Sequence, residues 1–226
     1  MNTFPNPLPS PIRAVIWDFN GTLIDDVELS VCAINTMLAR RGLRHLDTEG
    51  YRQVFGFPLA AYYQKIGIDV RPGDLSSLAD EFHASYLAGL HTCLPTKGVL
   101  EVLQLLQASG VKQVILSAME EESLRSAIAG LGLGGFFDQV YGLEHRRADS
   151  KLERGRQLLQ TLSLPPTEML LIGDTDHDVE VARALGIRPF VVAQGHQSAH
   201  RLSAAGFDVF PDFERLCQAL AGVLPH

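Results

Sequence analysis

Short apolar runs alternate along the chain with longer segments whose apolar residues recur at helical spacing. The apolar runs predict strands at residues 12–18, 112–117, 138–141, 168–172, 189–193 and 207–210. Helical spacing predicts intervening helices at residues 120–131, 152–162 and 178–185. This alternation is typical of βα units around a parallel sheet. We therefore predict an α/β fold, with a Rossmann-like parallel sheet that carries helices on both faces.

One stretch after the first strand breaks this alternation. Between residue 26 and about residue 93 the sequence gives helix signals and no convincing strand. The first predicted helix, residues 26–41, carries apolar residues at helical spacing, namely Val27, Val31, Ile34 and Leu38. An all-helical block at this place predicts a cap over the turn that follows the first strand. We therefore divide the chain into an α/β core of residues 11–24 and 94–226, a helical cap of residues 25–93, and an extended proline-rich arm of residues 1–10.

Composition narrows the class of protein. A chain of 226 residues suits one domain with a modest insertion, and a net charge of −7 disfavours nonspecific nucleic acid binding. No apolar segment of the sequence reaches the length of a membrane span. The three scattered cysteines indicate neither a disulfide framework nor a zinc site, so we expect a cytoplasmic protein. Its expected partner is a small molecule rather than a nucleic acid or a membrane, and whether it is a monomer or a homodimer stays open.

Four polar features, far apart in the sequence, are expected to meet at one edge of the predicted sheet. They are the segment from Asp18 to Thr22, Ser117 with Ala118, Lys151 at a helix start, and the acidic segment that contains Asp174 and Asp178. The ends of parallel strands point to one edge, where open α/β proteins bind ligands. Carboxylates hold Mg²⁺, a lysine neutralises phosphoryl oxygens, and a serine hydroxyl with backbone amides completes a phosphate cradle. The sequence therefore predicts a phosphate site with a divalent cation.

These segments, in this order, resemble the four motifs of the haloacid dehalogenase superfamily. Asp18 matches the nucleophile of that family, Ser117 its motif II hydroxyl, and Lys151 its motif III lysine. Asp174 and Asp178 match its motif IV acids. The order of core, helical cap and core resembles the phosphoglycolate-phosphatase-like branch, which has a C1-type cap. All four motifs in order form a much stronger signal than any one of them.

The resemblance implies a Mg²⁺-dependent hydrolase of small phosphorylated metabolites, a phosphomonoester phosphatase. In that family the aspartate matched by Asp18 attacks phosphorus and forms an aspartyl-phosphate, which is covalent catalysis with charge neutralisation by a metal. The implied Mg²⁺ ligands are Asp18, the backbone carbonyl of Asn20, Asp174 and Asp178. The implied contacts to the phosphoryl group are Gly21, Thr22, Ser117, Ala118 and Lys151.

Asn20 stands where the family usually has a second aspartate, which protonates the leaving group and then activates water. Its backbone carbonyl is kept, but an amide has no proton to give or accept at neutral pH. General acid and base catalysis is worth about 10² to 10⁴ in rate. We expect the loss to fall hardest on alkyl phosphates, whose leaving groups need a proton, and less on aryl or acyl phosphates. The Asn20–Gly21 pair is also prone to deamidation, which would convert part of a preparation to aspartate.

Other groups near Asn20 are candidates for the missing proton transfer, namely Asp25, Asp26, Asp176 and His177. We expect Asp25 or Asp26 to cap the following helix instead, and His177 to be a solvated polar residue. Four basic residues could reach an anionic substrate but are expected on solvated loops instead, namely Arg146, Arg147, His196 and His200.

The predicted cap contains an aromatic-rich turn, in which Phe55 and Gly56 are candidate substrate contacts. Packing of the cap's own small core explains these aromatic residues equally well. Two other functions stay open. One is different covalent chemistry in the same family, such as phosphonate or carbon–halogen cleavage, although the sequence around Lys65 does not favour a Schiff-base lysine. The other is a catalytically weak phosphate-binding or regulatory protein.

Overall fold

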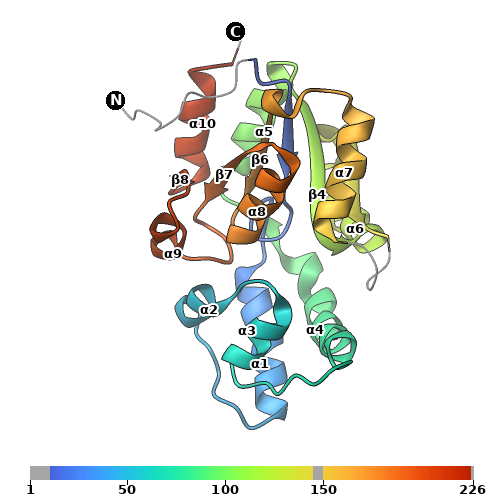
Figure 1. Ribbon diagram of the computed structural model, residues 1–226, viewed down its shortest axis with the longest axis vertical. Coiled ribbons are helices and arrows are strands. Elements are labelled where there is room, and N and C mark those ends of the chain that lie inside the picture. Colours follow the sequence, from blue (N-terminus) through green and yellow to red (C-terminus); the bar gives the residue numbers. More distant parts are fainter. Residues whose placement is uncertain (1–10, 145–149, 225–226) are drawn as a thin grey trace.

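A computed structural model describes residues 11–144 and 150–224, and its central element is a six-stranded parallel sheet (Figure 1). In spatial order the strands are β5 (Gln139–Leu143), β4 (Lys112–Glu120), β1 (Ala14–Trp17), β6 (Met169–Gly173), β7 (Arg188–Val192) and β8 (Val209–Phe210). Every neighbouring pair is parallel. All six coincide with predicted strands to within a few residues, so the predicted α/β fold is confirmed. The predicted arm of residues 1–10 lies outside the described residues.

Helices cover both faces of the sheet because successive strand residues point to opposite sides. In β1, Val15 and Trp17 belong to one apolar cluster, and Ala14 and Ile16 belong to another. The first cluster includes residues of α5 (Val99–Ala108), α6 (Glu121–Gly130) and α10 (Phe213–Ala221). The second includes residues of α7 (Lys151–Leu162) and α8 (Asp176–Leu185). The result is a three-layered core.

A group of helices lies at one end of the sheet rather than on its faces (Figure 1). They are α1 (Val27–Arg40), α2 (Thr48–Val54), α3 (Leu59–Lys65) and α4 (Leu75–Gly89), which we call the helical segment. The chain enters and leaves it through an antiparallel ribbon of β2 (Ile24–Asp25) and β3 (Leu94–Pro95). The segment has an apolar core of its own, which includes Ile34, Tyr51 and Tyr62. It can therefore pack largely by itself.

The structure also differs from the sequence-based expectation. Helices α2, α5, α10 and the short α9 (Ala199–Ala204) were not predicted. Strand β4 does not end at Ser117 but continues to Glu120, with an irregular register after Leu116. Asp26 is the N-cap residue of helix α1, as predicted, but its side chain makes no capping hydrogen bond. Within the described residues, no helix is both long enough and apolar enough to span a membrane.

Candidate functional site

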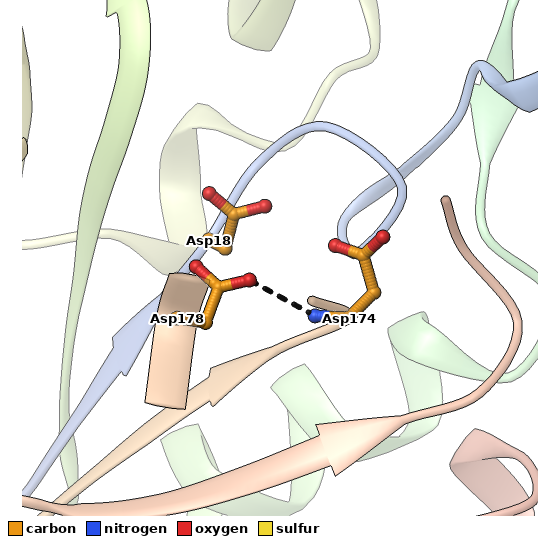
Figure 2. Close-up of side chains that lie close together, drawn as sticks. All are labelled: Asp18, Asp174 and Asp178. Carbon is orange, nitrogen blue, oxygen red and sulfur yellow. Dashed lines mark hydrogen bonds between the residues drawn. The ribbon is translucent and has the colours of Figure 1, made fainter. Parts of the chain in front are cut away.

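Three buried aspartates meet at the carboxyl edge of the sheet (Figure 2). Asp18 follows β1, Asp174 follows the neighbouring strand β6, and Asp178 lies in the first turn of α8. One carboxylate oxygen from each lies within 4.8 Å of those of the other two. Asp178 also accepts a hydrogen bond, 3.3 Å long, from the backbone N–H of Asp174. Adjacent parallel strands that end together bring these acids into one place.

Lys151, the first residue of α7, lies between two of these acids. Its Nζ donates to Oδ1 of Asp18 and, at 2.6 Å, to Oδ1 of Asp178, and its side chain is only 3% exposed. Burial, which outweighs the opposing charge of Lys151, raises the pKa of the Asp18 carboxyl. At Asp178 burial acts in the same direction, but there the ammonium of Lys151 prevails and lowers the pKa. The single ammonium of Lys151 therefore does not balance three ionised carboxylates, and the group carries an excess of negative charge.

The uncompensated negative charge fits a divalent cation. Burial raises the pKa of Asp174 above its ordinary value, and the neighbouring Asp178 carboxylate adds to this effect. A cation beside these oxygens would favour their ionised forms. Carboxylate oxygens are also the ligands that Mg²⁺ prefers. Asp18, Asp174 and Asp178 together thus form a donor set suited to Mg²⁺.

Asp174 is held on both sides by neighbouring loops. The Thr22 hydroxyl donates to its Oδ1 at 2.8 Å, and the backbone N–H of His196 donates to its Oδ2 at 2.6 Å. Gly21 has a φ of +72°, and a Cβ there would collide with the Asp174 carboxylate and the His196 ring, so the position requires glycine. The backbone N–H of Gly21 donates to Asp26 at 2.7 Å. Gly21 and Thr22 therefore form hydrogen bonds within the protein, and their contact with a substrate stays a prediction.

Asn20 belongs to a hydrogen-bond network centred on Asp26. The Asn20 side-chain nitrogen donates to Oδ2 of Asp26 at 2.9 Å and to the Tyr86 hydroxyl at 2.7 Å. The Tyr86 hydroxyl donates to the same Asp26 oxygen at 2.6 Å. The other oxygen of Asp26 accepts from Gly21 and lies 3.2 Å from Nε2 of His196. Asp26 therefore acts as an acceptor for donors from three separate parts of the chain.

His196 is buried in this network with 5% of its surface exposed, so the expectation of a solvated His196 was wrong. Its Nδ1 lies 3.0 Å from the Tyr51 hydroxyl. Although burial opposes protonation, the Asp26 carboxylate raises the pKa of His196 to about 9, while the pKa of Asp26 is lowered. The two residues form a buried ion pair. The signal that could have found His196 is its place just after β7, at the same sheet edge as Asp174. His200 is exposed, as expected.

A cavity of about 700 Å³ lies between this charged edge and the helical segment. Ser117 and Ala118 line it, and the buried Ser117 hydroxyl accepts a hydrogen bond from the backbone N–H of Met119 at 3.1 Å. Phe55 lines the opposite wall, whereas Gly56 is not part of the lining. Phe55 also packs against the core of the helical segment, so lining and packing are not exclusive roles for this aromatic turn.

The other candidates for proton transfer occupy varied surroundings. Asp25 is exposed, and Asp176 forms an ion pair with Arg201 at 2.6 Å. His177 is half-buried rather than solvated, and its ring stacks on Phe57 with 4.4 Å between the centroids. Two basic candidates lie outside the described residues, namely Arg146 and Arg147.

Comparison with known proteins agrees with this geometry. The family model described as haloacid dehalogenase-like hydrolase matches residues 15–192. A phosphoglycolate phosphatase from Rhodospirillum rubrum is 29% identical over 220 residues, which cover 90% of this chain and 89% of the relative. A predicted phosphatase from Clostridium acetobutylicum has a TM-score of 0.82 at 19% identity, covering 94% of this chain and 100% of its own.

A haloacid dehalogenase family hydrolase from Deinococcus radiodurans, solved with bound phosphate and sodium, has a TM-score of 0.71 at 24% identity. That alignment covers 95% of this chain and 98% of the other. At such identities the two structures support the fold alone. The family model, however, matches well over half of the sequence and spans the segments that carry Asp18, Ser117, Lys151 and Asp174. The chain therefore belongs to the haloacid dehalogenase-like hydrolases.

Proposed function

We propose that this hydrolase is a Mg²⁺-dependent phosphomonoester phosphatase that works through an aspartyl-phosphate on Asp18. The observation that carries the proposal is the position of the Asp18 carboxylate. It lies in the wall of the cavity, beside the Lys151 ammonium and two further carboxylates suited to a cation. This is the arrangement that nucleophilic attack on a phosphate requires, because positive charge must offset the charge of the phosphoryl oxygens.

Each residue then has a defined task. An oxygen of Asp18 attacks phosphorus, and the bond from phosphorus to the leaving oxygen breaks. Lys151 orients Asp18 and neutralises phosphoryl oxygens, while Asp178 fixes Lys151 through their 2.6 Å ion pair. The Ser117 hydroxyl, in the cavity wall, donates to a phosphoryl oxygen. A bound Mg²⁺, held by Asp18, Asp174, Asp178 and the Asn20 carbonyl, would supply charge neutralisation at the reacting phosphate.

Asn20 limits this mechanism at proton transfer. Its amide nitrogen donates to Asp26 and Tyr86, so it is directed at structural partners and has no proton to release at neutral pH. The leaving group must depart without a general acid at this position, and water must attack the aspartyl-phosphate without a general base there. Turnover is therefore expected to be slow for poor leaving groups.

The wider context supports the same proposal. The relative from Rhodospirillum rubrum is named a phosphoglycolate phosphatase. We also propose that residues 25–93 act as a cap that excludes water from the site, since they include the helical segment over the cavity. The three cysteines are free thiols, which supports a reducing, cytoplasmic location. Lys65 is exposed and does not line the cavity, which disfavours phosphonate chemistry through a Schiff base.

The test is phosphate release from phenyl phosphate with and without Mg²⁺. We expect Asp18→Asn to lower kcat by at least about 10³-fold, as loss of a nucleophile does in other enzymes. Asp25→Asn is the matched control, because Asp25 is an exposed aspartate in β2 that does not line the cavity, and the variant should behave as wild type. Mass analysis of the acid-quenched enzyme should find one phosphoryl group on the peptide that contains Asp18.

Two outcomes would contradict the proposal. Full activity of Asp18→Asn would remove Asp18 as the nucleophile. Mg²⁺-dependent binding of inorganic phosphate by a wild type without turnover would favour a phosphate-binding protein, a role that Asn20 makes worth testing.

A further inference from the structure

The cavity wall formed by the helical segment is mostly apolar, although Ser30 and His83 also line it. It includes Ile34, Phe55, Phe57, Leu59, Tyr62 and Phe82. These side chains come from α1, α3, α4 and the turn before α3, so they surround the space above Asp18 from several directions. A surface of this kind favours an apolar and planar organic group, because aromatic rings stack well and exclude water.

Among the residues that the structure describes, the lining offers no lysine or arginine that is free to pair with a second negative group on a substrate, although His83 and His177 also line the cavity. Within the described residues, Lys151 is the one lysine or arginine in the lining, and it is ion-paired with Asp18 and Asp178. The His196 imidazole is paired with Asp26. Two more carboxylates, Glu120 and Glu180, also line the cavity. A carboxylate on the organic part of a substrate would therefore lose its hydration without gaining an ammonium or guanidinium partner, which is costly.

Tyr62 belongs to the apolar wall although it carries a hydroxyl. It is 4% exposed, and its hydroxyl has no hydrogen-bond partner among the residues that the structure describes. Burial raises the pKa of this hydroxyl, so it stays a donor. The hydroxyl oxygen is also inaccessible to solvent, so Tyr62 lines the cavity with its ring and not with its hydroxyl.

Asn20 restricts which leaving groups can depart, and this restriction is independent of the apolar wall. Without an acid to protonate the leaving oxygen, the reaction favours alcohols that leave readily as anions. A phenol has a pKa of about 10, far below that of an alkyl alcohol, so phenolate leaves without help. The apolar wall and the missing acid thus select the same class of substrate.

We propose that the substrate is the phosphate monoester of an uncharged aromatic alcohol, whose ring lies against the apolar wall formed by the helical segment. This rests on the proposed phosphatase function. An Asp18 oxygen bonds to phosphorus, and the bond between phosphorus and the aryl oxygen breaks. The electron pair leaves with the aryl oxygen as phenolate, which takes a proton from water. Water then attacks the aspartyl-phosphate and releases phosphate, which regenerates Asp18. Phosphoglycolate, named for several relatives, carries a carboxylate and is a poor fit.

The first experiment compares four substrates with the full chain and Mg²⁺: phenyl phosphate, 1-naphthyl phosphate, 3-carboxyphenyl phosphate and phosphoglycolate. The three aryl esters have leaving groups of similar acidity, so differences among them report the cavity. We expect kcat/KM to rise about 3- to 10-fold from phenyl to naphthyl, because the second ring buries more apolar surface. We expect it to fall at least about tenfold with the carboxylate, and phosphoglycolate to be the poorest. Equal or better turnover of either carboxylated compound would overturn the proposal.

A second measurement separates this proposal from the phosphatase function. The affinities of the same four compounds for Asp18→Asn, obtained by calorimetric titration, test the cavity without turnover. If wild type hydrolyses none of them but the affinities keep the expected order, the catalytic proposal fails and the ligand class stands. If the order of affinities is reversed, the ligand class fails.

Variants of the wall provide the matched test. Leu59→Arg places a cation in the wall and should raise kcat/KM for 3-carboxyphenyl phosphate about tenfold relative to phenyl phosphate. Leu75→Arg, at an exposed leucine outside the lining, is the control and should leave that ratio unchanged. An unchanged ratio in Leu59→Arg would count against the position of the ring.

Discussion

The cavity has two walls that are built differently. On the side of the sheet, Asp18, Asp178 and Lys151 line the cavity and are buried together with Asp174, and hydrogen bonds from Lys151 and neighbouring turns fix the carboxylates. On the side of the helical segment, aromatic and aliphatic side chains such as Phe55 line the space. The first wall stands on the ends of adjacent strands, whereas the second belongs to helices with their own apolar core.

This difference suggests how the fold divides its work. Buried charges need close and fixed partners, because an unpaired charge in a low-dielectric interior is costly, and strand ends hold such partners rigidly. Apolar contacts are less directional and tolerate changes of shape, so a helical wall can vary without disturbing the charges. The chemistry should therefore be sensitive to single substitutions at the sheet edge, whereas substitutions in the helical wall should mainly change substrate preference.

The largest effect is expected from Lys151→Met. The variant removes the cation between Asp18 and Asp178, so we expect kcat to fall about 10³-fold or more. Leaving two buried carboxylates unpaired should also cost about 3 to 5 kcal/mol of unfolding free energy, part of which Mg²⁺ should restore. Steady-state kinetics and thermal denaturation with and without Mg²⁺ measure both effects.

Lys65→Met is the matched control for that variant. Lys65 lies in the helical segment, is exposed, and does not line the cavity, so activity and stability should stay close to wild type. If Lys65→Met lost activity and Lys151→Met did not, the charged wall would not be the catalytic one. The groups required for activity would then lie in the helical segment and not at the sheet edge.

A smaller effect is expected from the buried pair of His196 and Asp26. Asp26 raises the pKa of His196 from 6.5 to about 9, so the pair's stabilisation is complete below pH 6.5 and is lost as pH rises through about 9. This shift corresponds to about 3 kcal/mol. In the presence of a chelator, the unfolding free energy of wild type should fall by about 3 kcal/mol more than that of His196→Gln as pH rises from 6.5 to about 9.

Exposed His200 provides the control for the pH experiment. His200→Gln should follow the pH profile of wild type in urea denaturation measured at each pH. Parallel profiles for wild type and His196→Gln would show that the pair adds no pH dependence.

The strand-end rule explains why the sheet and the aspartate site could be predicted from the sequence. Apolar runs such as the one before Asp18 are long enough to indicate buried strands, and the acids after them must then share an edge. The same rule applies to His196 after β7, but a His-Gln-Ser loop looks like ordinary solvated sequence. Its partner Asp26 looks like a helix cap. Their contact joins residues 170 positions apart (196 − 26), and no local pattern encodes it.

The missed helices have two different explanations. Helix α5 is rich in leucine and valine, and short sequences of this kind do not readily distinguish a buried helix from a strand, although Glu101, Gln104 and Gln107 recur at helical spacing on its exposed side. Helix α2 is a short, mostly polar helix, and its N-cap Asp47 bonds to Gly50, a feature shared with ordinary turns. The character of the cavity's second wall could not be predicted, because Ile34, Phe55 and Phe82 come together only through tertiary packing.

An increase of about 10- to 100-fold in kcat for an alkyl phosphate is expected when Asn20 is converted to the family's usual aspartate. In wild type the Asn20 amide donates to Asp26, so Asn20→Asp alone would set two carboxylates against each other and raise the pKa of one. We expect the single variant to raise kcat for ethyl phosphate about tenfold. The double variant Asn20→Asp/Asp26→Asn exchanges donor and acceptor, and we expect it to raise the same kcat about 100-fold. Phenyl phosphate should gain less in both variants, because its leaving group needs no proton.

Two controls belong to this comparison. Peptide mass analysis must show that wild type retains Asn20, since deamidation would supply the aspartate variant in part. Equal gains on ethyl and phenyl phosphate would show that Asn20 does not limit protonation of the leaving group. Equal gains for the single and double variants would show that Asp26 does not oppose an acid at position 20.

The smallest effect is expected on the outer surface of the helical segment, where partly exposed ion pairs should stabilise the protein less than the buried ion pairs at the sheet edge do. Glu81 pairs with Arg40 at 3.0 Å and Arg41 at 2.6 Å, and hydrogen bonds from Arg41 lower its pKa although partial burial opposes this. Its stabilisation is therefore present above the ordinary pKa of 4.5 and is lost as pH falls below it.

Because the Glu81 side chain is 17% exposed and the arginines more so, solvent screens the interaction. Glu81→Gln should cost only about 1 kcal/mol at neutral pH, less in high salt, and leave kcat/KM for phenyl phosphate unchanged. Urea denaturation at pH 7 and pH 4 measures the difference, which should shrink at the lower pH. A loss as large as that of Lys151→Met would mean that ion pairs far from the cavity matter as much as those that hold Asp18, and the contrast between the two walls would not explain the site.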